Sequence, residues 1–81
     1  MSEHLSFQDA EQLIQVVSTW YAAQLMKERR AALPDPERLI TLQDALAACA
    51  ADRKALQDAG PEERDEIVAR YAARARELGA Q

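Results

Sequence analysis

The stretch from Leu13 to Met26, LIQVVSTWYAAQLM, constrains the fold more than any other part of this chain. Its apolar residues recur at the spacings of an α-helix, so the stretch is predicted to be helical. When successive residues are placed 100° apart, the apolar positions cover roughly 200° of the helix circumference, whereas a helix on a single core typically carries an apolar stripe of about 100°. This helix therefore needs apolar neighbours on two sides.

The wide apolar arc consists of two adjacent lines of side chains. The first line contains Ala10, Ile14, Val17, Tyr21 and Leu25. The second line contains Leu13, Val16, Trp20 and Ala23. Either the rest of the chain covers both lines, so that Trp20 and Tyr21 are core residues, or it covers the first and leaves the second to a partner chain. We expect the second line to be an interface with a partner chain, because the third helix is too short to cover the full length of the first helix.

Glycine and proline divide the chain into three predicted helices, at about residues 7–32, 36–59 and 61–78. The first can be capped by Ser6 and must end before Pro34, because proline disfavours helical geometry in the residue that precedes it. Strand patterns are missing, since the β-branched pair Val16 and Val17 lies within a helical pattern. We predict an all-α fold: an antiparallel three-helix arrangement with a long first helix, forming one small domain over residues 1–81 that gains stability by dimerising.

The two turns have distinct local signals. Asp35 is a candidate N-cap for the second helix, although Thr41 with Asp44 offers a later start, in which case residues 36–40 form a separate short turn before the helix. Gly60 is expected to close the second helix in the left-handed conformation, and Pro61 to open the third. Each helix therefore has at least one residue that defines its start.

Charge and composition limit the classes of partner. The net charge is −4, with a pI of about 4.9, which disfavours binding to phosphate backbones because that binding needs a cationic surface. We find no apolar run long enough to span a membrane and no signal-peptide pattern, so a cytoplasmic location is expected. The single Cys49 suits a reducing compartment.

The sequence contains no arrangement typical of catalysis. A nucleophile beside a base, a carboxylate pair in a cleft or a cluster of metal ligands would be needed, and none has usable spacing. His4 precedes the first helix and is expected to be exposed, and Cys49 lies in an apolar stripe as a small buried hydrophobe. We therefore predict neither enzymatic activity nor a cofactor nor a metal site.

Arg53 is the most unusual charged residue, because it projects near the centre of the apolar stripe of the second helix, between Cys49 and Leu56. Its charge needs a partner, and Glu63 or Glu66 across the hairpin is the simplest one. The alternatives are an anion site that Arg53 forms with Tyr71, or extension of the side chain to solvent.

The predicted function follows from the interface and not from chemistry. We expect a small acidic protein of the accessory or regulatory kind that binds protein, as a homodimer or with a larger partner. The alternative is a nucleic-acid-binding regulator that uses, after dimerisation, the arginines of the third helix, Arg64, Arg70, Arg74 and Arg76. A third possibility is a carrier that encloses a small ligand among Trp20, Tyr71, Cys49 and Arg53.

Overall fold

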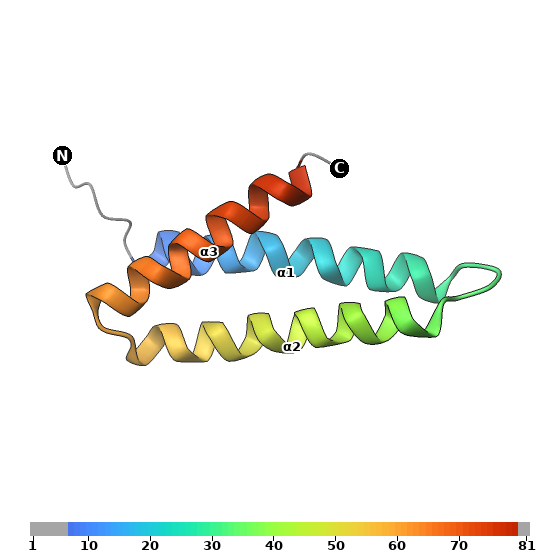
Figure 1. Ribbon diagram of the computed structural model, residues 1–81, viewed down its shortest axis with the longest axis horizontal. Helices are drawn as coiled ribbons and strands as arrows, with labels where there is room; N and C mark the ends of the chain where they lie inside the picture. The colour runs from blue at the N-terminus through green and yellow to red at the C-terminus, as the bar shows by residue number, and fades with distance from the viewer. Residues whose placement is uncertain (1–6, 80–81) are drawn as a thin grey trace.

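The computed structural model describes residues 7–79, which form three α-helices (Figure 1). These are α1 (Phe7–Arg29), α2 (Pro36–Asp58) and α3 (Pro61–Gly79). The prediction of an all-α fold with three helices is confirmed. Ser6, the predicted cap of the first helix, and His4 lie outside the described residues.

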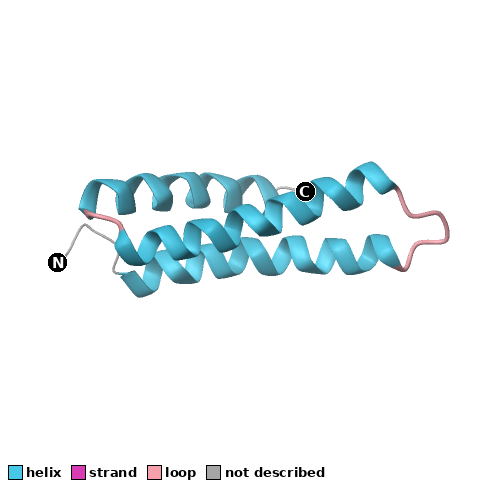
Figure 2. Cartoon of the chain, turned by 90° about the horizontal axis from the view of Figure 1, so that it is seen from below, coloured by secondary structure: helices cyan, strands magenta, loops and turns pink. Residues whose placement is uncertain are grey.

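Helix α1 is the centre of the arrangement. It packs along both α2 and α3, whereas α2 and α3 make few contacts with each other. Helices α1 and α2 form a long antiparallel hairpin, and α3 crosses α1 and diverges from α2 toward its C-terminal end (Figures 1 and 2). The described part of the chain is elongated, with extents of 50 × 25 × 15 Å. Two sides of α1 are thus used within the chain.

The main core lies near the end of the molecule where all three helices meet. Helix α1 contributes the first line of its apolar arc, which is its inner line, α2 contributes Cys49 and Leu56, and α3 contributes Ile67 and Tyr71. Within that inner line, the buried residues of the cluster are Ala10, Ile14 and Val17. Farther along the hairpin, Leu25 and Leu42 are buried outside this cluster. The inner line therefore performs the role predicted for it, and the outer half of the hairpin depends on fewer apolar residues.

The loop between α1 and α2 is held by side chains. Helix α1 ends at Arg29, three residues before the predicted end, and Glu28 then accepts a hydrogen bond from the backbone N–H of Asp35 at 3.1 Å. The second carboxylate oxygen of Glu28 pairs with Arg38 at 3.2 Å. Asp35 caps α2 by accepting hydrogen bonds from the N–H groups of Glu37 and Arg38. This cap places the start of α2 at Pro36.

The predicted left-handed conformation of Gly60 is wrong. No described residue, glycine included, has a positive φ. Helix α2 instead ends in the extended residue Ala59, with φ −74° and ψ 138°, and the carbonyl of Gly60 accepts the first helical hydrogen bond of α3 from Arg64 at 2.9 Å. The physical reason is Pro61, which favours extended geometry in the residue before it. Gly60 thus starts α3 and does not close α2.

Candidate functional site

The four residues of the predicted interface lie on α1 at different depths. Leu13 is partly buried and packs against the core cluster. Val16 is 49% exposed, Ala23 is exposed, and Trp20 is half-buried. The Trp20 ring lies edge-on to the ring of Tyr21, with 5.5 Å between the centroids. The chain therefore uses Leu13 itself and leaves the surface at Val16 and Ala23 open.

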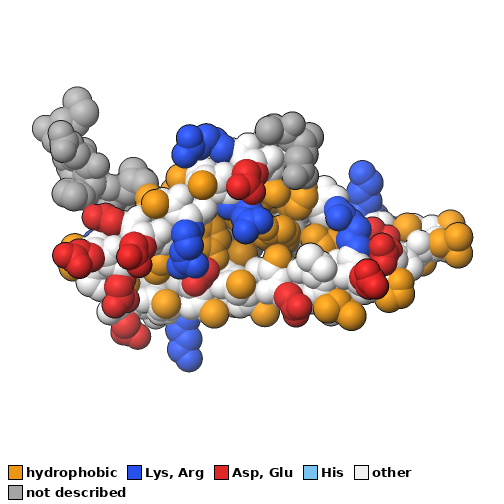
Figure 3. Space-filling model, in the orientation of Figure 1, with side chains coloured by type: hydrophobic (Ala, Val, Ile, Leu, Met, Phe, Trp, Pro, Cys, Tyr) orange, Lys and Arg blue, Asp and Glu red, His pale blue; other side chains and the backbone are white. Residues whose placement is uncertain are grey.

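The end of the α1–α2 hairpin also carries exposed apolar residues. Leu33 in the loop is 90% exposed, and Met26 and Ile40 are more than half exposed. Hydrophobic side chains are visible at this end of the molecule in Figure 3. Because Met26 belongs to α1 and Ile40 to α2, this surface is formed by both helices of the hairpin.

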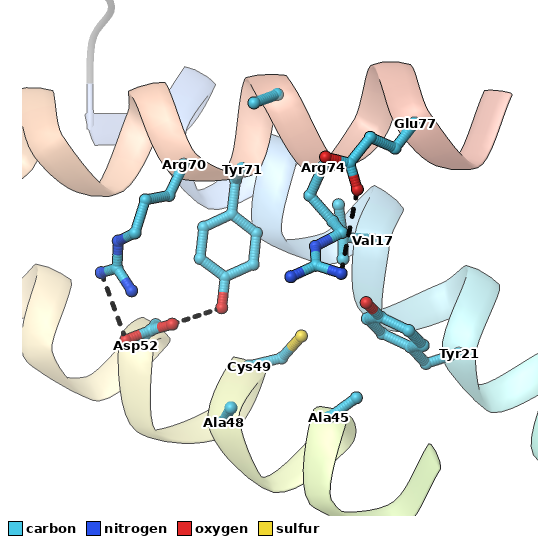
Figure 4. A pocket seen from close by; sticks show the side chains of 11 residues that line it. Val17, Tyr21, Ala45, Ala48, Cys49, Asp52, Arg70, Tyr71, Arg74 and Glu77 are labelled. Carbon is cyan, nitrogen blue, oxygen red and sulfur yellow. Dashed lines mark hydrogen bonds and ion pairs between the residues drawn. The ribbon is translucent and has the colours of Figure 1, made fainter. Parts of the chain in front are cut away.

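A cleft lies between α2 and α3, with α1 as its floor (Figure 4). Its volume is about 350 Å³. The apolar residues that line it are Val17, Tyr21, Ala45, Ala48, Cys49 and Ala73. The polar ones are Asp52, Arg70, Tyr71, Arg74 and Glu77. The cleft exists because α3 diverges from α2 and because alanines, which are too small to close the gap, face it from both helices.

Asp52 is the centre of the polar network in this cleft. The Tyr71 hydroxyl donates a hydrogen bond to its Oδ2 at 2.5 Å, and Arg70 Nη2 lies 3.7 Å from its Oδ1. Farther along α3, Arg74 pairs with Glu77 at 4.0 Å. The guanidinium groups of Arg70 and Arg74 lie on either side of the Tyr71 ring in Figure 4. The cleft thus combines an apolar floor with two cationic groups at its edge.

Burial perturbs two of the groups in the cleft. Burial raises the pKa of the Cys49 thiol above its ordinary value, and the Asp52 carboxylate acts in the same direction. Burial also raises the pKa of Tyr71, and the hydrogen bond to Asp52 adds to this effect. Both groups are therefore neutral near pH 7, and Cys49 lacks the thiolate character of a reactive cysteine.

The structure does not bring Arg53 and Tyr71 together. Arg53 is exposed and lines a separate hollow with polar residues of α1, among them Glu11 and Gln12. In the described part of the chain, no ion pair joins Arg53 to Glu63 or Glu66. Because Arg53 is exposed, its predicted place at the centre of the apolar stripe of α2 is wrong. Consecutive residues of a helix point 100° apart, and Asp52 lines the cleft whereas Arg53 lines the hollow on the other flank of α2.

Sequence reasoning missed Asp52, the residue that actually meets Tyr71. A usable signal was present, because a buried tyrosine needs a hydrogen-bond partner for its hydroxyl. Asp52 follows the buried Cys49 by one helical turn and so lies beside the apolar stripe of α2. Arg53 projects nearer the centre of that stripe than Asp52 does, so the sequence pattern favoured Arg53. The outcome depended on which flank of α2 faces α3, and periodicity within α2 does not specify this.

The arginines of α3 do not share one outward face. Arg64 is half-buried, and its Nε is buried without a hydrogen-bond partner among the described residues. Arg70 and Arg74 border the cleft, and Arg76 is exposed. The basic residues of α3 are thus distributed over different surroundings.

Further properties concern the described residues as a set. Within residues 7–79, no helix is long and apolar enough to cross a membrane. The same residues contain no group of three or more His, Cys, Asp or Glu side chains placed to hold a metal ion. Comparison with protein-family models, curated proteins and solved structures finds no match to this chain.

Proposed function

We propose that this chain is a non-enzymatic protein-binding module that forms a homodimer through α1. The contact surface is the second line of the apolar arc, Leu13, Val16, Trp20 and Ala23. The observation that supports it is the 49% exposure of Val16 in the middle of a helix, next to the half-buried Trp20. An aromatic residue at the centre of an apolar surface is the usual anchor of a protein interface.

The spacing of this line favours a second copy as the partner. The four residues follow one another at intervals of three, four and three, as in the seam of a coiled coil. This series is the same in both directions. If two α1 helices pack antiparallel about a two-fold axis, Val16 of each copy meets Trp20 of the other, and Leu13 meets Ala23. A two-fold interface requires such a self-complementary surface.

The charges at the two ends of α1 support the antiparallel direction. Asp9 lies in the first turn and Lys27 in the last. They extend the apolar line by four residues at either end, so the antiparallel register places Asp9 of one copy beside Lys27 of the other. A parallel pair would instead place like charges together, which is unfavourable.

Dimerisation has a physical benefit for a chain of this size. The main cluster contains few bulky residues, and one small core rarely supplies more than about 3–5 kcal/mol of net stability. Covering Val16 and Trp20 removes further apolar surface from water, at about 25 cal/mol per Å². The second copy thus supplies apolar contacts that α3 does not provide.

Sedimentation equilibrium over a wide concentration range tests this proposal. We expect a dimer for the unaltered chain, and we expect Val16→Glu to weaken association by about two orders of magnitude, because a carboxylate would be buried against apolar side chains. Val16 is half-exposed, so the variant should keep its helical circular dichroism. The matched control is Ala47→Glu on the exposed side of α2, which should remain a dimer. A monomeric unaltered chain, or a Val16→Glu variant that associates as strongly as the unaltered chain, would refute the proposal.

A further inference from the structure

The cleft between α2 and α3 is separate from the proposed dimer surface and suits a small molecule. We infer that it binds a small amphipathic carboxylate, with the carboxylate at Arg74 and the apolar body between α2 and α3 (Figure 4). Its volume of about 350 Å³ lies at the lower end of the range for small-molecule sites, so the ligand is short.

The walls of the cleft match an apolar body. Val17 and Tyr21 of α1 form the floor, and the alanines of α2 and α3 line the sides. Val17 and Cys49 are almost completely buried, so this floor continues directly into the core. Apolar surface between α3 and α2 is visible beside basic side chains in Figure 3. A short alkyl chain or a single aromatic ring gains from contact with such walls.

The polar edge selects a single negative charge. Both oxygens of Asp52 already have partners, Tyr71 and Arg70, so this carboxylate is compensated within the chain. The interaction of Arg74 within the chain is weak, because its ion pair with Glu77 is 4.0 Å long and the Glu77 side chain is 67% exposed. Exposed ion pairs contribute little, so a ligand carboxylate can replace Glu77 with little loss. A guanidinium group binds a carboxylate with two parallel hydrogen bonds.

Other ligand charges fit less well. A cation would lie beside the guanidinium groups of Arg70 and Arg74, and the second charge of a dianion would find only Arg70, which already pairs with Asp52. A neutral molecule could use the apolar walls but would gain nothing from Arg74. The arrangement therefore distinguishes a carboxylate from an alcohol of the same length.

Trp20 provides a spectroscopic reporter for this site. It is the single tryptophan of the chain, and its ring contacts Tyr21, which lines the cleft. The experiment is a titration of the full chain with octanoate, below its micelle concentration, followed by tryptophan fluorescence and by calorimetry. The same titration with 1-octanol is the uncharged comparison. We expect saturable binding of octanoate and about tenfold weaker binding of octanol.

Two variants separate the charge from the cavity. Arg74→Gln should weaken octanoate binding by about tenfold and abolish the preference over octanol, because the charge-assisted hydrogen bonds are lost. Ala48→Leu, which fills the cleft and keeps Arg74, should weaken the binding of both compounds. The control Arg29→Gln, on an exposed arginine of α1, should bind as the unaltered chain does.

The inference is overturned by equal affinity for octanoate and octanol, by unchanged octanoate binding in Arg74→Gln, or by the lack of saturation with octanoate in the unaltered chain. Circular dichroism verifies that each variant is folded. Because Arg74 and Ala48 do not belong to the dimer surface, the sedimentation behaviour of these variants should not change. Failure of this inference therefore leaves the proposed dimer unaffected.

Discussion

The hydroxyl of Tyr71 on α3 donates a hydrogen bond to the carboxylate of Asp52 on α2, 19 residues earlier in the chain. This bond joins two helices that otherwise make few contacts with each other. Tyr71 is buried and Asp52 half-buried, so the bond lies at the boundary between the core and the cleft. It therefore helps to set how far α3 diverges from α2.

Removal of this hydrogen bond should destabilise the chain. We expect Tyr71→Phe to lower the free energy of unfolding by about 1.5 kcal/mol, because a hydrogen bond to a charged acceptor is lost while the ring remains. Urea denaturation measures this change. The matched control is Tyr21→Phe, since no hydrogen bond of the Tyr21 hydroxyl is present among the described residues, and its effect should stay within about 0.5 kcal/mol. Equal losses for the two variants would contradict the role of Asp52.

Stability should fall at alkaline pH. The pKa values of Cys49 and Tyr71 are raised in the folded chain above their ordinary values of 9.0 and 10.0. In that range the unfolded chain binds fewer protons than the folded one, so the free energy of unfolding decreases as pH rises. The stabilising contribution is complete below about pH 9 and is lost progressively above it.

Urea denaturation at a series of pH values from neutral to alkaline measures this loss. Tyr71→Phe removes one of the two groups, so its stability should decline less steeply above pH 10 than that of the unaltered chain. Parallel pH profiles for the two proteins would show that the titration of Tyr71 is not linked to folding.

Charge reversal should reveal the direction of the proposed dimer. Asp9→Lys or Lys27→Asp alone places like charges together at both ends of the interface and should weaken association by about three- to tenfold. The double variant exchanges the two charges and should recover most of the affinity. Sedimentation at low and high salt measures the effect, which should diminish as salt screens it. An additive loss in the double variant would exclude the antiparallel register.

The Asp35 cap at the start of α2 should stabilise the folded chain. Asp35 accepts hydrogen bonds from the N–H groups of Glu37 at 3.0 Å and Arg38 at 3.4 Å. We expect Asp35→Ala to lower the free energy of unfolding by about 1 kcal/mol, and Asp35→Ser to retain most of it, because serine is also a good N-cap. Thermal unfolding measures both. If the two variants lose the same stability, the cap contributes little.

The ends of the helices could largely be predicted from the sequence because they depend on neighbouring residues. Asp35 and Pro36 mark the start of α2, and Pro61 marks the start of α3, as expected. The exceptions also have local causes. Glu28 and Asp35 form contacts in the loop after α1, and Gly60, which precedes a proline, does not have a positive φ. Both involve competition between signals that lie only a few residues apart.

The inner line of α1 was also evident from the sequence, because helical periodicity alone identifies which side of a helix is apolar. Ala10, Ile14, Val17 and Leu25 are buried as predicted. Periodicity does not specify how two apolar helices are rotated and inclined against a third. The tertiary structure alone decided that Asp52 faces α3 while Arg53 lies on the opposite flank, and that α3 diverges enough to leave a cleft. The physical reason is that both choices depend on the packing of α2 and α3 on α1, which involves contacts between residues far apart in the sequence.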